Sequence, residues 1–172
     1  MLPATRTAGE GIALSVPQVE KRKAQPYVAV AVTGPMAKLP HFAPPKIGEL
    51  AAKLAAAGVV PAGPAFFRYR KFSGDRVELE IAFPVAAKAP EIAGAIKASL
   101  PAGRYACATF AGPYDRLFDA MCMLNGWIEG RGLAPAGRPG QPECQVERYR
   151  VSPMDTQAAA EWRTDLLVMV AD

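Results

Sequence analysis

The sequences FFRYR at residues 66–70 and VERYR at residues 146–150 share the ending Arg-Tyr-Arg. Each follows a segment that begins with Gly and contains Pro-Ala-Gly: GVVPAGP at residues 58–64 and GLAPAGR at residues 132–138. Recurrence of an ordered pair of motifs is typical of an internal repeat, and such repeats are sought before any other pattern. We therefore interpret the chain as two copies of one structural unit.

The neighbouring segments extend the match in both directions. In each half an apolar strand and a Gly-Pro turn lie upstream, and a second apolar strand lies downstream. In the first half these are residues 27–32, 33–35 and 77–85, and in the second half residues 104–110, 111–113 and 164–170. Chance recurrence in a chain rich in Ala, Gly and Pro is the alternative. Four matches in the same order argue against chance.

A helical pattern lies between the matching strands of each half. Ile47, Leu50 and Leu54 are spaced three and four apart, which puts them on one helix face. Pro45 fits the start of this helix and Gly58 fits its C-terminal cap. The second half carries a longer stripe of the same kind, ended by two glycines: Leu117, Met121, Leu124, Ile128, Gly130 and Gly132. Each half therefore predicts strand, helix, strand, strand.

These elements predict an α+β fold of two β-α-β-β units, about residues 15–88 and 98–172. We expect one ligand-binding domain at residues 15–172 after a flexible tail at residues 1–14, with residues 16–22 adding to the first strand. Each helix should pack its apolar face on its own sheet. The duplicated units then predict two antiparallel-type sheets flanking a central cleft, with the helices on the outer faces, and pockets tend to form at such interfaces.

The repeat differs by one charge in the middle of a strand. Alternation puts Gln145, Glu147 and Tyr149 on one face, and the equivalent residues of the first half are Phe67 and Tyr69. Glu147 therefore stands where the first half has Phe67. A carboxylate there is costly to bury without a partner. An ion pair with a nearby Arg, or a glutamate exposed at a sheet edge, is the alternative to a functional role.

Aromatic side chains could share a cavity with Glu147. The candidates are Phe67, Tyr69, Phe110, Trp127, Tyr149 and Trp162. Core packing is the alternative for each, and it is the better interpretation for Trp127, which lies within a helical stripe. An acid ringed by aromatic groups would suit a cationic, lipophilic molecule. If burial raised its pKa, the same acid could act as a general acid or base.

Composition fits an ordinary soluble globular protein, with 172 residues, 51% apolar and 21% charged. The net charge of +4 is mild, and the one basic cluster, residues 21–23, is interpreted as a solvated strand end. We therefore expect no direct nucleic-acid binding. No apolar run reaches the roughly 18–20 residues that span a bilayer, and the N-terminus lacks a signal-peptide core. A cytoplasmic protein without membrane contact is expected.

Cysteine and histidine give little support for redox or metal chemistry. Cys107, Cys122 and Cys144 form an odd count without a close pair, which favours structural thiols over disulfides. His41 is the single histidine, and without a C-x-x-C motif we expect no zinc or other metal site and no cofactor. A Ser-His-Asp triad is disfavoured because His41 lies in a Pro-rich loop.

A set of short motifs occurs in one order and spacing: GPY at residues 112–114 with Leu117, Trp127 with Gly132, Glu147-x-Tyr149 with Pro153, and WRTDL at residues 162–166. In this combination the chain, from about residue 17 to 170, resembles the GyrI-like small-molecule-binding family, also known as the effector-binding domain of AraC-type and multidrug-sensing regulators. The first half departs from the usual pattern through a Pro-rich approach to its helix at Pro40, Pro44 and Pro45. This departure bears on the mouth of the pocket.

The resemblance implies a stand-alone domain with a pocket between the halves, where the glutamate corresponding to Glu147 contacts cationic lipophilic ligands. Members of the family include drug-sensing regulators, stand-alone proteins linked to gyrase inhibition or toxin resistance, and hydrolases that open cyclopropane rings of DNA-alkylating natural products. Those hydrolases use the glutamate and nearby aromatic groups around a water. Glu147 and Tyr149 could carry such roles, because binders and enzymes share the motif.

Three functions therefore stay open. The first is multidrug or toxin binding and sequestration, with Glu147 as the key acid. The second is hydrolysis of electrophilic, cyclopropane-type toxins, with Glu147 activating water. The third is a protein-partner module such as a gyrase modulator; haem binding through His41 is a weaker fourth. The residues before the first strand are too few for a helix-turn-helix, so we do not expect a DNA-binding regulator, and nothing in the sequence indicates the oligomeric state.

Overall fold

The computed structural model describes residues 12–172. Each half follows the order strand, helix, strand, strand, which confirms the predicted α+β fold. The first half contains β3 (Gln25–Pro35), η1 (Met36–Lys38), α1 (Leu39–Phe42), α2 (Pro44–Ala56), β4 (Phe66–Ser73) and β5 (Arg76–Pro84). The second contains β7 (Gly103–Ala111), η2 (Tyr114–Arg116), α3 (Leu117–Gly130), β10 (Gln145–Val151), η3 (Ala159–Glu161) and β11 (Arg163–Met169).

Five further strands lie outside the repeated order. They are β1 (Ala13–Leu14), β2 (Gln18–Arg22), β6 (Ile96–Leu100), β8 (Gly137–Arg138) and β9 (Gln141–Pro142). Residues 1–11 of the predicted flexible tail at residues 1–14 lie outside the described residues. The end of this segment forms β1, which pairs with β7. None of the helices formed by the described residues is long and apolar enough to cross a membrane.

The strands of the two halves form one nine-stranded antiparallel sheet rather than the two sheets expected from the sequence. Its order is β1-β7-β11-β10-β4-β5-β3-β6, with β2 also paired to β7. The halves meet where β10 pairs with β4. Two separate sheets would leave these strands as edges with unpaired backbone groups in the middle of the protein, and their pairing removes that cost.

The pairing of β10 with β4 gives the sheet a local twofold symmetry. Glu147 pairs with Phe67, its own equivalent in the repeat, while Arg148 pairs with Phe66 and Val146 pairs with Arg68. A twofold axis between Glu147 and Phe67 exchanges these flanking pairs. The residues that differ between the halves thus meet at the centre of the sheet.

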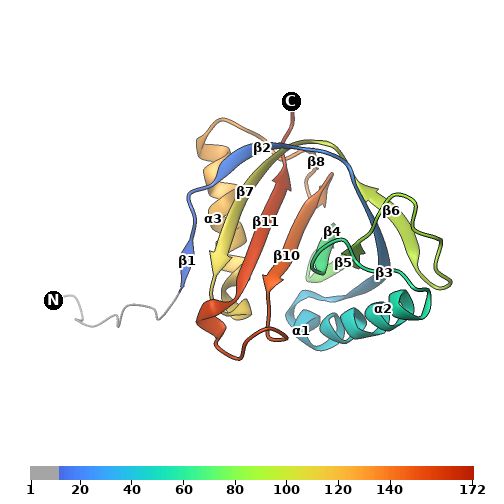
Figure 1. Ribbon diagram of the computed structural model, residues 1–172. Helices are drawn as coiled ribbons and strands as arrows, with labels where there is room; N and C mark the ends of the chain where they lie inside the picture. Colours follow the sequence, from blue (N-terminus) through green and yellow to red (C-terminus); the bar gives the residue numbers. More distant parts are fainter. Residues whose placement is uncertain (1–11) are drawn as a thin grey trace.

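The sheet is strongly curled, which explains how two of its strands are connected. Only residues 23–24 separate β2 from β3, yet β2 pairs with β7 near one end of the sheet and β3 pairs with β5 and β6 near the other. In Figure 1 this stretch forms a continuous blue arc that joins the two ends. Residues 16–22, expected to extend the first strand, therefore supply a partner for the second half instead.

Both long helices cover the outer face of the curled sheet, as predicted. Leu50 and Leu54 of α2 pack with Val28 of β3, and α3 packs on β7 and β11. The inner face carries a different apolar cluster, which includes Tyr27, Phe66, Tyr105, Val146 and Leu167. The helices therefore leave the inner face to the strands and to the link between β2 and β3.

The predicted helix stops are confirmed at Gly58 and Gly132. Their φ angles are +67° and +68°, a left-handed conformation that favours glycine. The residue after each glycine donates its backbone N–H to the carbonyl of the residue five positions before it. These hydrogen bonds join Val59 to Leu54 at 2.9 Å and Leu133 to Ile128 at 3.0 Å. This pattern satisfies carbonyls at the helix end and lets the chain turn toward the next strand.

The three cysteines are free thiols in different environments. Cys144 is buried and Cys107 is half-buried, in keeping with structural roles. Cys122 is exposed on α3, although its neighbours in the sequence are apolar. The apolar stripe of α3 faces the sheet on the opposite side of the helix, so local hydrophobicity did not report the orientation of Cys122.

Candidate functional site

Glu147 lies in the middle of β10 with only 7% of its surface exposed. It occupies the outer face of the sheet, with Phe67, Tyr69 and Tyr149, in the space between the two helices. The sequence predicted the companions correctly but put the group in a seam on the helix-free face. Alternation tells which residues share a face, and it does not tell which face the helices cover.

Two tyrosines, one from each half, hold the carboxylate. The Tyr69 hydroxyl donates a hydrogen bond to Oε2 of Glu147 at 3.0 Å, and the Tyr149 hydroxyl donates to the same oxygen at 2.8 Å. Tyr69 and Tyr149 are equivalent in the repeat. The second oxygen, Oε1, accepts no hydrogen bond from a protein group within residues 12–172.

Glu147 has no basic partner in the part of the chain that the structure describes. The two arginines that follow it on the strand, Arg148 and Arg150, pair with Asp165 at 2.9 and 3.0 Å. Both alternatives to a functional role, an ion pair and an exposed edge, therefore fail for Glu147. Burial raises the pKa of its carboxyl, and the hydrogen bonds from Tyr149 and Tyr69 only partly oppose this.

A chain of aromatic contacts extends from Tyr149, one of the two tyrosines that hold the carboxylate. Phe67 meets Tyr149 edge-on with ring centroids 4.9 Å apart. Tyr114 lies 5.4 Å from Tyr149 and 4.8 Å from Trp162, which brings Trp162 into the group. Burial, with the carboxylates of Asp155 and Glu147 nearby, raises the pKa of Tyr114 to about 12. These rings present apolar and π surface beside one negative charge.

Two of the predicted site residues belong to the core under α3 instead. Phe110 is 3% exposed and packs among the residues that α3 buries. Trp127 packs against the same core and stacks with Arg131, whose guanidinium carbon is 5.5 Å from the ring centroid. For Trp127 this agrees with the interpretation that its helical stripe favoured. Of the residues predicted for the site, the structure brings together Glu147, Tyr149, Tyr69, Phe67 and Trp162, the last through Tyr114.

Sequence reasoning missed the residues that cover this site. Met36, Leu39 and Phe42, from η1 and α1, pack against the cluster that contains Phe67 and Tyr69. The Pro-rich approach flagged in the sequence is this cover. Tyr114 was also missed, although its position in the GPY motif was a signal for it. The covering residues gave none, because their apolar side chains are not periodic.

The cover depends on a glycine in β3. A Cβ added at Gly34 would lie 2.7 Å from the ring of Phe42, so only glycine lets this ring pack so close to the strand. The helix α1 that carries Phe42 has four residues and no side-chain cap. Short segments with few hydrogen bonds open at low cost.

The fold is thus a curled antiparallel sheet with two outer helices, and an acid held by two tyrosines lies between them. The match to the GyrI-like small molecule binding domain runs over residues 15–171, and the chain belongs to this family. Its fold and the resemblance noted in the sequence agree with this membership. No functionally curated protein is similar enough in sequence to count as a relative.

Solved structures with the same fold include proteins of different kinds. The C-terminal domain of EcmrR has a TM-score of 0.75 and 20% identity, covering 91% of this chain and 98% of that one. SAV2435 bound to tetraphenylphosphonium has a TM-score of 0.65 and 12% identity, covering 91% and 94%. A hydrolase from Listeria innocua has a TM-score of 0.60 and 13% identity, covering 90% and 91%. At these identities the likeness shows the fold.

Proposed function

We propose that this protein binds lipophilic cations between α2 and α3, with Glu147 meeting the positive charge, and that it acts as a drug- or toxin-binding protein. The observation that carries the proposal is the burial of Glu147 without a basic partner among the described residues. An uncompensated buried carboxylate costs several kcal/mol. A bound cation would offset that cost, which makes Glu147 a suitable partner for a positively charged ligand.

The surroundings of Glu147 fit a cation with apolar groups. Phe67, Tyr149, Tyr114 and Trp162 supply dispersion and cation–π attraction beside the carboxylate. The tyrosine hydroxyls fix the orientation of Oε2. Tetraphenylphosphonium, the ligand in the structure of SAV2435, has this chemistry and is a suitable probe.

Binding of tetraphenylphosphonium by isothermal titration calorimetry tests the proposal. Glu147→Gln keeps the shape of the side chain and removes its charge, and loss of a desolvated charge pair costs about 2–5 kcal/mol, or roughly 30-fold to several-thousand-fold in Kd. Glu129→Gln is the matched control, because Glu129 is an exposed glutamate of α3. Tetraphenylborate, which has nearly the same shape and the opposite charge, should bind much more weakly when it is titrated alone. Equal affinity in the wild type and in Glu147→Gln would refute the proposal.

A hydrolytic function is a second candidate, favoured by the state of Oε1. This oxygen receives no hydrogen bond from residues 12–172 and could hold a water, while the raised pKa of Glu147 suits a general base. Water would add to one carbon of a cyclopropane as a ring C–C bond breaks. The proton from water would pass to Glu147 and then to the other carbon.

Mass spectrometry distinguishes this candidate from binding alone. The protein is incubated with an electrophilic cyclopropane compound, and the product of water addition is measured over many turnovers. Catalysis that disappears in Glu147→Gln and persists in Glu129→Gln supports the hydrolase. Tight binding of tetraphenylphosphonium without consumption of the cyclopropane supports the binder.

A further inference from the structure

The inner face of the sheet carries a separate basin, opposite the face that holds Glu147. Its volume is about 450 Å³, within the range of small-molecule pockets. Phe66, Val146 and Leu167 contribute apolar surface from β4, β10 and β11, and residues 23–24 of the link between β2 and β3 close one side. The basin exists because the sheet curls and the link spans its two ends.

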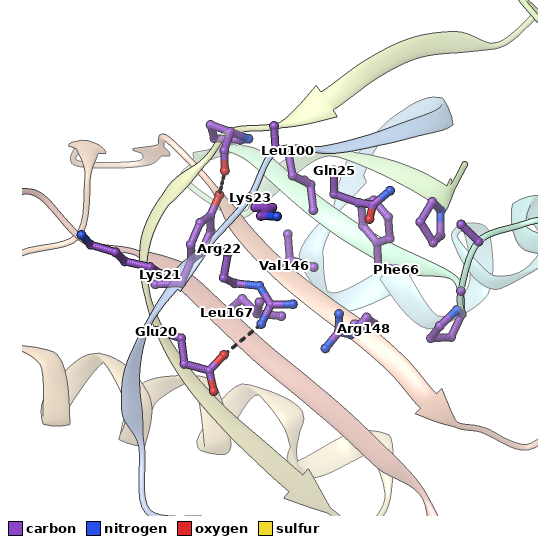
Figure 2. Close-up of a pocket in the computed structure, with 17 residues that line it drawn as sticks. Glu20, Lys21, Arg22, Lys23, Gln25, Phe66, Leu100, Val146, Arg148 and Leu167 are labelled. Atoms are coloured by element: carbon purple, nitrogen blue, oxygen red, sulfur yellow. Dashed lines mark hydrogen bonds and ion pairs between the residues drawn. The ribbon is translucent and has the colours of Figure 1, made fainter. Parts of the chain in front are cut away.

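Basic residues outnumber acidic ones among the residues that line this basin. The charged residues among them are four basic ones, Lys21, Arg22, Lys23 and Arg148, and one acid, Glu20. Figure 2 shows the guanidinium groups of Arg22 and Arg148 directed into the basin near Leu167, while Lys21 points away. The basic cluster at residues 21–23, interpreted from the sequence as a solvated strand end, thus contributes one guanidinium to a concave, partly apolar surface.

Both arginines keep donors that the protein does not use. Arg22 pairs with Glu20 through Nη1 at 3.1 Å. Arg148 pairs with Asp165 through Nε at 3.2 Å and Nη2 at 2.9 Å. Within residues 12–172, Nη2 of Arg22 and Nη1 of Arg148 therefore have no hydrogen-bond partner. Their side chains are 31% and 33% exposed, so the charges are partly shielded from water.

We propose that this basin binds an organic anion with a flat apolar body and one carboxylate or sulfonate group. The anionic group accepts hydrogen bonds from Arg22 and Arg148, whose planar guanidiniums suit such oxygens. The apolar body lies on Phe66, Val146 and Leu167. This site is distinct from the one proposed for cations and does not depend on it.

Strand β10 separates the two sites. Glu147 projects to the outer face, while its neighbours Val146 and Arg148 project to the inner face. One strand thus presents an acid to one side of the sheet and a base to the other. A cation suited to Glu147 is repelled by the inner basin, and an anion suited to Arg148 is repelled by the outer site.

Fluorescence titration with 8-anilinonaphthalene-1-sulfonate tests the proposal on the folded full-length chain. N-phenyl-1-naphthylamine is the matched neutral ligand, because it lacks only the sulfonate. We expect Arg22→Gln to weaken sulfonate binding about fivefold, since partly exposed charge contacts contribute about 1 kcal/mol. Arg116→Gln is the control, because Arg116 is exposed and paired with Asp119 at the start of α3. It should change nothing.

Further arms locate the bound sulfonate. Saturating tetraphenylphosphonium and the variant Glu147→Gln should both leave its affinity unchanged, and the neutral ligand should bind at least tenfold more weakly. Lys23→Gln, at an exposed position in the link, should weaken binding about twofold without affecting the fold. An affinity of Arg22→Gln equal to that of the wild type, or displacement of the sulfonate by tetraphenylphosphonium, would overturn the assignment of the anion to the inner basin.

Discussion

Replacing Glu147 by glutamine should stabilise the protein at neutral pH when no ligand is bound. The carboxylate is 7% exposed and has no basic partner among the described residues, so its ionised form carries a desolvation cost of several kcal/mol. Glutamine is neutral and of the same shape, and its carbonyl oxygen can still accept from Tyr69 and Tyr149. Each of these two hydrogen bonds weakens by about 1 kcal/mol when its acceptor loses the charge.

The balance of these effects is a gain of about 1–2 kcal/mol in the free energy of unfolding, or about 3–6 °C in Tm for a chain of this size. The gain should depend on pH in a defined direction. Burial raises the pKa of Glu147 in the folded state. At a pH between the unfolded pKa, near 4.5, and the folded pKa, the folded state therefore binds more protons than the unfolded state. Wild-type stability therefore has its full Glu147 contribution below pH 4.5 and loses it as pH rises through the folded pKa.

Urea unfolding of the wild type and Glu147→Gln between pH 4 and pH 8 measures this effect. The two curves should converge at the acidic end and separate as pH rises, with the variant more stable. Glu129→Gln, on the exposed side of α3, should follow the wild type throughout. If Glu147→Gln is less stable than the wild type at pH 8, or differs from it by a constant amount, the carboxylate is compensated in the folded state and the reasoning on ligand binding fails with it.

Other contacts make separate predictions. Gly34→Val should displace the Phe42 ring, which lies 2.7 Å from the added Cβ position, and should cost about 1–3 kcal/mol in urea unfolding. It should also speed the association of tetraphenylphosphonium in stopped-flow measurements, and an unchanged rate would show that Phe42 does not gate the site. Tyr149→Phe removes the 2.8 Å donor to Glu147, so the pKa of Glu147 should rise further in a carbon-13 NMR titration; a lower pKa would contradict this. Asp165→Asn weakens two arginine pairs, one of them with Arg148, and should cost about 1–3 kcal/mol in thermal unfolding, whereas an unchanged Tm would mean that the pairs contribute nothing.

The repeated order of elements could be predicted from the sequence because its evidence is local. Helix stripes, strand alternation and the two glycine stops are each set by residues a few positions apart. Gly58 and Gly132 show this best, since both adopt the left-handed conformation that a helix end requires. The grouping of Phe67, Tyr69 and Tyr149 around Glu147 followed from the same alternation together with the match between the halves.

The face of the sheet that holds Glu147 could not be predicted in this way. It depends on how the helices fold back across the strands, which is a long-range choice. The pairing of β4 with β10 is equally non-local, as is the pairing of β2 with β7. Phe110 lies in the core under α3 rather than beside Glu147 for this reason: aromatic character is the same in a core and in a site, and only the fold separates them.

The twofold symmetry explains why the site has a single acid. Repeat equivalence would allow a glutamate in both halves, but the equivalents of this position, Glu147 and Phe67, pair directly across β10 and β4. Two carboxylates there would stand opposite each other in a buried site, and like charges on directly paired strand residues destabilise a sheet. One of them would have to stay protonated. An acid opposite an aromatic ring avoids this conflict, leaving one negative charge on the axis with a tyrosine from each half, an arrangement that matches a ligand carrying one positive charge.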